Sequence, residues 1–146
     1  MAARVILHVE DDDDYASLLR YYWNRSAIGD CTLHRVASAN EAIDYLERAL
    51  AGEQTIPALV LVDLEMHGIN GLELLEWIHY NPKLSSVPAA VLSWWDEPRR
   101  IERAVRLGVG KYVSKGEDFR GIVARIEQLI PAPESVKMPI VTGQGI

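Results

Sequence analysis

The sequence predicts an α/β protein with a doubly wound parallel sheet, and three features of the chain support this. Short apolar runs recur along it, segments with helical periodicity separate these runs, and the strand–helix alternation occurs five times. Such alternation favours a parallel sheet with helices on both faces, joined by right-handed crossovers. Because five units are too few for a closed eight-stranded barrel, we expect an open sheet of five strands accompanied by five helices.

Four of the predicted strands are continuous apolar runs, as expected for parallel strands that helices cover on both faces. A fifth run, Cys31–Ala37, alternates apolar and polar residues and is typical of an edge strand. The continuous runs are Val5–Val9, Ala58–Val62, Ala89–Leu92 and the weaker Lys111–Val113.

Five segments with helical periodicity follow the strands. The second opens with Ser38 three residues before Glu41, which is the spacing of a capping box. The fourth has Pro98 in its first turn and Gly108 just past its end, where helices favour these residues. In chain order, the apolar positions that define the helices are Tyr15, Leu18, Leu19 and Tyr22; Ile43, Leu46 and Leu50; Leu72, Leu75 and Ile78; Ile101, Ala104 and Val105; and Phe119, Ile122, Val123, Ile126 and Ile130.

The 146 residues are enough for one domain with a substantial core. We expect this domain to span residues 1–131, and the proline- and glycine-rich residues 132–146 to form a flexible tail or the stub of a linker. The net charge of −6 speaks against general nucleic-acid binding. The chain has a single cysteine, Cys31, and no apolar stretch long enough for a signal peptide or a membrane span. We therefore expect a cytoplasmic protein.

Polar side chains follow the apolar runs where the strands are expected to end. Glu10 and Asp11 follow the first run, Asp63 the third and Ser93 the fourth, while Lys115 lies just past the last. In open α/β sheets, ligands bind beyond the carboxyl ends of the strands. The sequence therefore predicts three acids, a hydroxyl and an amine at one edge of the sheet.

These groups fit phosphoryl transfer onto a protein side chain. Clustered carboxylates repel one another unless a cation intervenes, and Mg²⁺ is a cation that prefers oxygen ligands. A carboxylate can also attack phosphorus and form an aspartyl phosphate. An ammonium and a hydroxyl would then stabilise the charge of the transferred group. By contrast, Asp12–Asp14 are expected to form an ordinary solvated helix start.

Four segments of the chain carry a resemblance to a known family. VILHVEDDDD, LVLVDLEMHGINGLELL, AAVLSWW and KYVSK resemble, in order and spacing, the signature segments of two-component response-regulator receiver domains of the single-domain, chemotaxis-regulator type. The match spans roughly residues 4 to 130. The resemblance implies a flavodoxin-like sheet with strand order 2-1-3-4-5 and a phosphoprotein of phosphorelay signal transduction, not an enzyme.

The resemblance also implies roles for individual residues. Asp63 matches the phosphate acceptor, and Glu10 and Asp11 match the acidic pair that holds Mg²⁺ together with Asp63 and the backbone carbonyl of Glu65. Three residues near the ends of the last two strands match the groups that respond to the phosphate: Ser93 the switch hydroxyl, Tyr112 the aromatic residue whose rotamer follows that hydroxyl, and Lys115 the phosphate-binding lysine.

The implied partners are proteins. The phosphate donor would be a histidine kinase or a phosphotransfer protein, and the phosphorylated conformation would signal by contact with a downstream protein target. The resemblance leaves homodimer formation open. Neither direct nucleic-acid binding nor membrane insertion is expected.

Four positions depart from the family pattern and bear on the kinetics of phosphorylation. His67 stands where the family commonly has proline, and Gly116 replaces the proline that usually follows the lysine. Trp94 follows the switch serine where a small residue is usual, and Glu65 adds a negative charge near the acceptor. These departures motivate a second hypothesis, an atypical receiver that binds proteins without being phosphorylated.

Two competing hypotheses belong to different classes of function. The sequence Asp63-Leu64-Glu65 superficially resembles the nucleophile motif of haloacid-dehalogenase phosphatases, but in that family the metal acids come after the nucleophile, and no inserted cap is present here. A flavin carrier on the same fold would need a phosphate-binding loop after the first strand, where this chain has acids.

Overall fold

The structure, a computed structural model, describes residues 4–26, 29–66, 70–94, 98–107, 109 and 111–131. The predicted tail at residues 132–146, and the predictions for His67 and Gly108, lie outside these residues.

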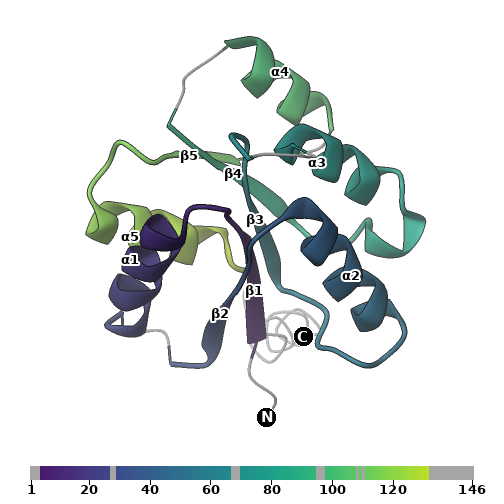
Figure 1. Cartoon of the computed structure of the whole chain (residues 1–146), viewed down its shortest axis with the longest axis horizontal. Helices are drawn as coiled ribbons and strands as arrows, with labels where there is room; N and C mark the ends of the chain where they lie inside the picture. Colours follow the sequence, from purple (N-terminus) through teal and green to yellow (C-terminus); the bar gives the residue numbers. More distant parts are fainter. Residues whose placement is uncertain are drawn as a thin grey trace, which may run out of the picture.

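The chain forms a five-stranded parallel sheet with the order β2-β1-β3-β4-β5, as predicted (Figure 1). A short 3₁₀ helix, η1, precedes β4. The elements are β1 (Arg4–Val9), α1 (Asp13–Asn24), β2 (Cys31–Val36), α2 (Ala39–Leu50), β3 (Leu59–Asp63), α3 (Gly71–His79), η1 (Pro82–Leu84), β4 (Ala89–Ser93), α4 (Pro98–Arg106), β5 (Lys111–Ser114) and α5 (Phe119–Leu129).

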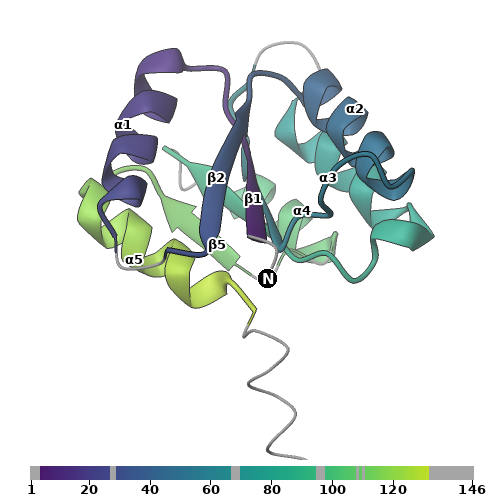
Figure 2. The same ribbon diagram turned by 90° about the horizontal axis from the view of Figure 1, so that it is seen from below.

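Helices cover both faces of the sheet and create two separate cores. Helices α1 and α5 pack on one face, and α2, α3 and α4 pack on the other (Figure 2). Successive strand residues point to opposite faces, so Leu61 joins the core under α1 and α5 while Val60 and Val62 join the core under α2, α3 and α4. This two-sided burial explains why the central strands read as continuous apolar runs.

The edge strand β2 follows the predicted alternation from Cys31 to His34 and departs from it at Val36. Cys31, Leu33 and Val36 are buried, whereas Thr32 and His34 are exposed. Cys31 and Leu33 join the core under α1 and α5, whereas Val36, at the end of the strand, joins the core under α2, α3 and α4. No helix in the described part of the chain combines the length and hydrophobicity that a membrane span requires.

Two predicted helix faces are partly wrong. Leu18 of α1 is 48% exposed, because the helix instead buries a face that includes Leu19 and Trp23, whose indole Nε1 donates to the carbonyl of Cys31 at 2.9 Å. In α4, Val105 is 59% exposed and Ala104 faces the core. A cavity of about 220 Å³ lies between α4 and the end of the sheet, so this helix covers the sheet less fully than a tightly packed one would.

The two ends of the described chain meet at the amino edge of the sheet. Arg4 begins β1, and its Nη1 donates to the carbonyl of Pro131 at 2.6 Å. The carboxyl ends of the strands, where the predicted site residues lie, form the opposite edge.

Candidate functional site

The predicted site residues gather at the carboxyl edge of the sheet. Asp63 is the last residue of β3 and Ser93 the last of β4, so each of these strands ends one residue later than predicted. Glu10 follows β1 directly, and Lys115 follows β5. These four side chains are buried, although all are polar.

A buried lysine joins two of the acids. Nζ of Lys115 lies 2.7 Å from Oε1 of Glu10 and 3.3 Å from Oδ2 of Asp63, and the three side chains are at most 2% exposed. Burial of charges is costly unless they are paired. The lysine therefore neutralises part of the negative charge that the acids bring into the protein.

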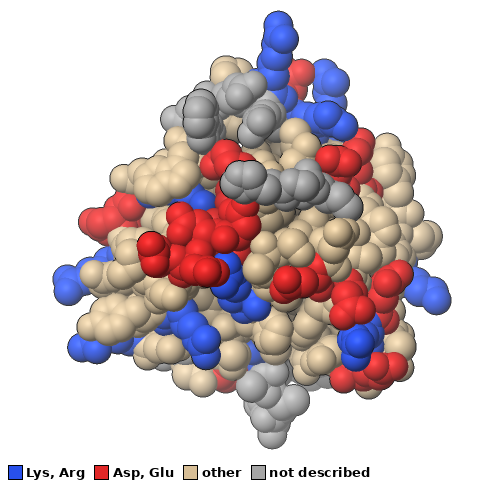
Figure 3. Space-filling view, in the orientation of Figure 1, with Lys and Arg blue, Asp and Glu red and all other residues tan. Residues whose placement is uncertain are grey.

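The acids also form a set of donors suited to a hard cation. Carboxylate oxygens of Glu10, Asp11 and Asp63 all lie within 4.8 Å of one another. These three residues line a cavity of about 390 Å³, together with Glu65 and Trp94. Figure 3 shows acidic side chains gathered over the connection between β1 and α1, at this edge. An all-oxygen set with room for water fits Mg²⁺, which binds one or two carboxylates and keeps several waters.

Glu10 has an unusual proton affinity in this environment. Burial raises the pKa of its carboxyl to about 7, and the nearby charge of Asp63 also raises it. The hydrogen bond from Lys115 acts in the opposite direction and lowers the pKa, but burial dominates. At neutral pH a proton therefore competes with any cation for this carboxylate.

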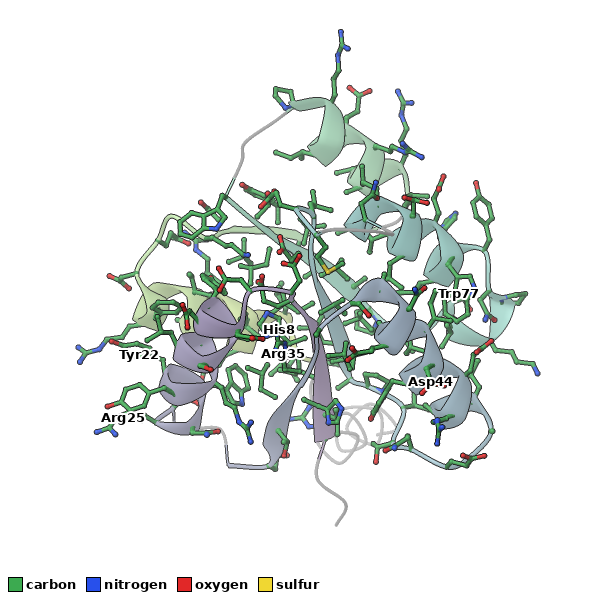
Figure 4. All side chains as sticks on the ribbon, viewed as in Figure 1. His8, Tyr22, Arg25, Arg35, Asp44 and Trp77 are labelled. Atoms are coloured by element: carbon green, nitrogen blue, oxygen red, sulfur yellow. The ribbon has the colours of Figure 1, made fainter. Side chains whose placement is uncertain are left out.

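Arg35 holds the loop that carries the acidic pair, a role that the sequence does not reveal. Its Nε donates to the carbonyl of Glu10 at 2.8 Å, and its Nη2 lies 2.8 Å from Oδ1 of Asp13. Arg35 pairs with His8 in the β1–β2 register, and Figure 4 shows these two side chains close together near the centre of the molecule. The edge strand thus fixes the position of Glu10.

Asp12 acts as the N-cap of α1, as the predicted helix-start role implies. Its Oδ1 accepts hydrogen bonds from the amides of Asp14 at 3.0 Å and Tyr15 at 3.1 Å. Asp12 through Asp14 are exposed. Their carboxylates interact favourably with the helix dipole.

Aromatic rings surround the lysine. Nζ of Lys115 lies 4.3 Å from the ring centroid of Tyr15 and 6.0 Å from that of Trp94. The two rings meet edge to face with centroids 6.0 Å apart, and Tyr15 also contacts Phe119 of α5. Such cation–π contacts stabilise the ammonium. The helical periodicity predicts only that Tyr15 lies on the core face of a helix. Its position in the first helical turn, directly after the acidic run, could also have indicated that it lies near the site.

The carboxylate of Glu65 binds the end of β4. It accepts hydrogen bonds from the hydroxyl of Ser93 and from the backbone amide of Trp94, the latter at 3.1 Å. The backbone amide of Glu65 donates to Oδ1 of Asp63 at 2.9 Å. Glu65 therefore connects the predicted acceptor with the predicted switch hydroxyl, a contact that spacing alone does not predict.

Tyr112 contacts the end of β4. Its hydroxyl donates to the carbonyl of Ser93 at 3.4 Å, and its ring lines the cavity beside α4. The side chain is partly buried. A movement of the Ser93 backbone would therefore change the hydrogen bond of Tyr112, whose ring lies beside α4.

Two glycines fit the backbone around the site. A Cβ on Gly71, at the start of α3, would lie 2.4 Å from the carbonyl oxygen of Asp63, so only glycine permits this close approach. The amide of Gly116 donates to Oγ of Ser114 at 3.1 Å. The proline usual at the position of Gly116 has no N–H and could not make this bond.

Comparison with known proteins agrees with this geometry. Residues 6–127 match the family model of the response regulator receiver domain, a signalling module. The probable methanogenesis regulatory protein FilR2 of Methanothrix harundinacea is 26% identical over 125 residues, which cover 86% of this chain and 80% of that protein.

Solved structures with the same architecture include two response regulators. The Mn²⁺-bound form of response regulator Rcp1 is similar with a TM-score of 0.77 at 27% identity, covering 88% of this chain and 99% of that chain. The phosphorylated cyanobacterial phytochrome response regulator RcpA is similar with a TM-score of 0.78 at 27% identity, covering 88% and 94%. On its sequence match, strand order and strand-end residues, the chain belongs to the family of response regulator receiver domains.

Proposed function

We propose that this receiver accepts a phosphoryl group on Asp63 from a phosphohistidine of a histidine kinase or phosphotransfer protein, and signals by contact with a downstream protein. One observation carries the proposal: Lys115 lies between Glu10 and Asp63 in a buried acidic cluster that opens into a cavity. A merely structural ion pair would not need a third carboxylate, that of Asp11, within ligand distance.

The residues that would hold Mg²⁺ are Glu10, Asp11, Asp63 and the backbone carbonyl of Glu65. When bound, Mg²⁺ supplies positive charge that offsets the negative charge of the phosphoryl oxygens. That the solved relatives include a Mn²⁺-bound and a phosphorylated response regulator supports both parts of the proposal.

The covalent step forms one bond and breaks one. A carboxylate oxygen of Asp63 attacks phosphorus, the P–N bond to the donor imidazole breaks, and the imidazole takes up a proton as it leaves. Lys115 approaches the acceptor through its ammonium and stabilises the extra charge on the transferred group. Burial of Asp63 excludes bulk water from the carboxylate and strengthens these interactions.

The conformational change that carries the signal would begin at the end of β4. The hydroxyl of Ser93 turns toward the phosphoryl group, and Tyr112, which bonds the carbonyl of Ser93, moves with it and changes the surface beside α4. The kinase and the downstream target would meet this receiver in the cytoplasm.

The test is incubation with acetyl phosphate or phosphoramidate and Mg²⁺, followed by intact-protein mass measurement. We expect the wild type to gain one phosphoryl group, and Asp63→Asn to gain none. Asp14→Asn is the matched control because it removes an exposed carboxylate from the same acidic face, and it should be labelled like the wild type. A folded wild type that gains no mass would instead favour the phosphorylation-independent binding module.

A further inference from the structure

The carboxylate of Glu65 occupies the hydrogen-bond donors at the end of β4. One oxygen accepts from the hydroxyl of Ser93 and the other from the backbone amide of Trp94 at 3.1 Å. Both oxygens of one anion are therefore bound by one hydroxyl and one amide. Hydrogen bonds to a charged group are among the stronger ones in proteins.

A phosphoryl group on Asp63 would compete for the same donors. In the β3–β4 register Asp63 pairs with Leu92, so the next residues of β4 stand beside the acceptor. Glu65, Trp94 and Asp63 line one cavity. A phosphoryl group brings three further oxygens into this space, and two anions cannot use the same hydroxyl and amide at once.

We propose that Glu65 is a built-in competitor of the phosphoryl group: its carboxylate holds Ser93 and Trp94 in the unphosphorylated receiver and must leave them when Asp63 is phosphorylated. This inference rests on the proposed function and adds a regulatory residue to it. Glu65 lowers the rate at which Asp63 is phosphorylated, because the phosphoryl group must replace the Glu65 carboxylate on the same two hydrogen-bond donors.

The competitor differs from a simple charge effect. Any acid near Asp63 disfavours a second anion by repulsion. The competition, however, also couples Glu65 to Ser93. In the wild type, Ser93→Ala has two opposing effects on phosphorylation: the phosphoryl group loses one hydrogen-bond donor, but the contact of Glu65 with Ser93 no longer has to be broken. In a protein without the Glu65 carboxylate there is no such contact, so Ser93→Ala only removes the donor and slows phosphorylation more.

The first measurement tests the contact in the unphosphorylated protein. In ¹H–¹⁵N NMR spectra, Glu65→Ala should move the Trp94 amide proton upfield and speed its exchange with solvent, since the amide loses its acceptor. Asp14→Asn, which removes a charge of the same face without touching Trp94, should leave this resonance in place. An unchanged Trp94 resonance in Glu65→Ala overturns the inference.

The second measurement tests the competition. With acetyl phosphate and Mg²⁺, Glu65→Ala should be phosphorylated about tenfold faster than the wild type, the factor that one charge-assisted hydrogen bond represents. Glu65→Gln keeps the side-chain size and one acceptor oxygen, and its rate should lie between the two. Asp14→Asn should stay within about twofold of the wild type. Ser93→Ala should slow labelling more in the Glu65→Ala background than in the wild type.

The outcomes separate this inference from the proposed function. Labelling of wild type and Glu65→Ala at equal rates, or an equal effect of Ser93→Ala in both backgrounds, overturns the competitor and leaves Asp63 as the acceptor. A wild type that is labelled measurably but more slowly than Glu65→Ala supports both proposals, whereas labelling of Glu65→Ala alone supports the competitor and contradicts phosphorylation of the wild type. Absence of labelling in every variant overturns both.

Discussion

Three buried charges determine the chemistry of this site. Lys115 contacts Glu10 and Asp63, and its ammonium rests against the ring of Tyr15. One lysine cannot neutralise two carboxylates, so the cluster retains a negative charge that either a proton or a cation must offset. Glu10, with its raised pKa, is the group that takes up the proton.

The first prediction concerns Glu10 and pH. Its pKa is about 7 in the folded protein, against 4.5 for an ordinary glutamate, so its contribution to stability is fully present below pH 4.5 and is lost as the pH rises through 7. Without divalent cations, the wild type should lose on the order of 2 kcal/mol of unfolding free energy relative to Glu10→Gln between pH 4.5 and 8. Urea unfolding of both proteins at several pH values measures the difference. Parallel pH profiles would contradict the prediction.

The second prediction concerns His8, which is fully buried and whose two ring nitrogens have no hydrogen-bond partner among the described residues. Burial lowers its pKa from 6.5 to about 3, with further lowering from the charges of Lys115 and Arg35. Its contribution to stability is therefore present above pH 6.5 and is lost as the pH falls toward 3. His8→Leu should raise the unfolding free energy by about 1 kcal/mol at pH 7 and more at pH 5. A destabilised His8→Leu at pH 5 would show that the ring has a partner.

The sequence predicts the residues of the site better than their contacts. The positions of Glu10, Asp63, Ser93 and Lys115 follow from the rule that parallel strands end at one edge, which needs only the strand boundaries. The contact between Glu65 and Ser93 depends on side-chain rotamers across two strands. The contacts of Arg35 depend on strand register. Neither rotamer nor register can be obtained from spacing along the chain.

At the scale of elements, the close contact of α3 with β3 positions Asp63, the proposed acceptor. Gly71 begins α3 directly against the carbonyl of Asp63, and Asn70 with Glu73 forms a capping box that fixes the helix start. The helix and the strand end therefore move together, and a change in one displaces the other.

The third prediction follows from this contact. Gly71→Ala places a Cβ 2.4 Å from a backbone oxygen, and because backbone cannot yield cheaply, we expect a loss of about 1–3 kcal/mol in unfolding free energy and slower labelling of Asp63. Gly29→Ala is the control, since nothing lies within 4 Å of its added Cβ. Chemical unfolding of the two variants gives the comparison. Equal stability of both would exclude the steric explanation.

Helix faces show where periodicity is insufficient. The apolar spacing of α1 places Leu18 on the buried face, but the helix buries Leu19 and Trp23, whose indole bonds the carbonyl of Cys31, and Leu18 is half exposed. For α5, the predicted residues Ile122, Val123 and Ile126 are the buried ones. Spacing along the chain therefore identifies an apolar stripe but does not fix which of its flanking residues is buried.

At the scale of the whole molecule, the site joins the two cores. Glu10 and Lys115 lie beside the aromatic residues under α1 and α5, whereas Tyr112 packs against the core under α2, α3 and α4. A change at the strand ends therefore acts on both layers of helices. This arrangement suits a switch, because a small shift at one edge can alter surfaces on both faces.

The fourth prediction concerns cation binding and global stability. A ligand that binds only the folded state stabilises it by about 2.7 kcal/mol at a hundred times its dissociation constant. We expect Mg²⁺ to raise the melting temperature at pH 8 and to lose most of this effect in Asp11→Asn. Asp44→Asn on α2 removes an exposed acid that pairs with Arg48 and is not in the acidic set, and this variant should respond like the wild type. Differential scanning calorimetry with and without Mg²⁺ is the measurement, and equal responses of the two variants would argue against Asp11 as a ligand.

The hydrogen bond between Arg4 and Pro131 has a consequence for how the fold can be joined to other chains. Because the start of β1 is in direct contact with Pro131, two residues after α5, a short peptide could link them and the chain could be opened in a loop elsewhere. Sequences fused at either end would emerge from the edge of the sheet farthest from Asp63. The fold can thus be inserted into a larger protein at junctions that lie away from the acidic cavity.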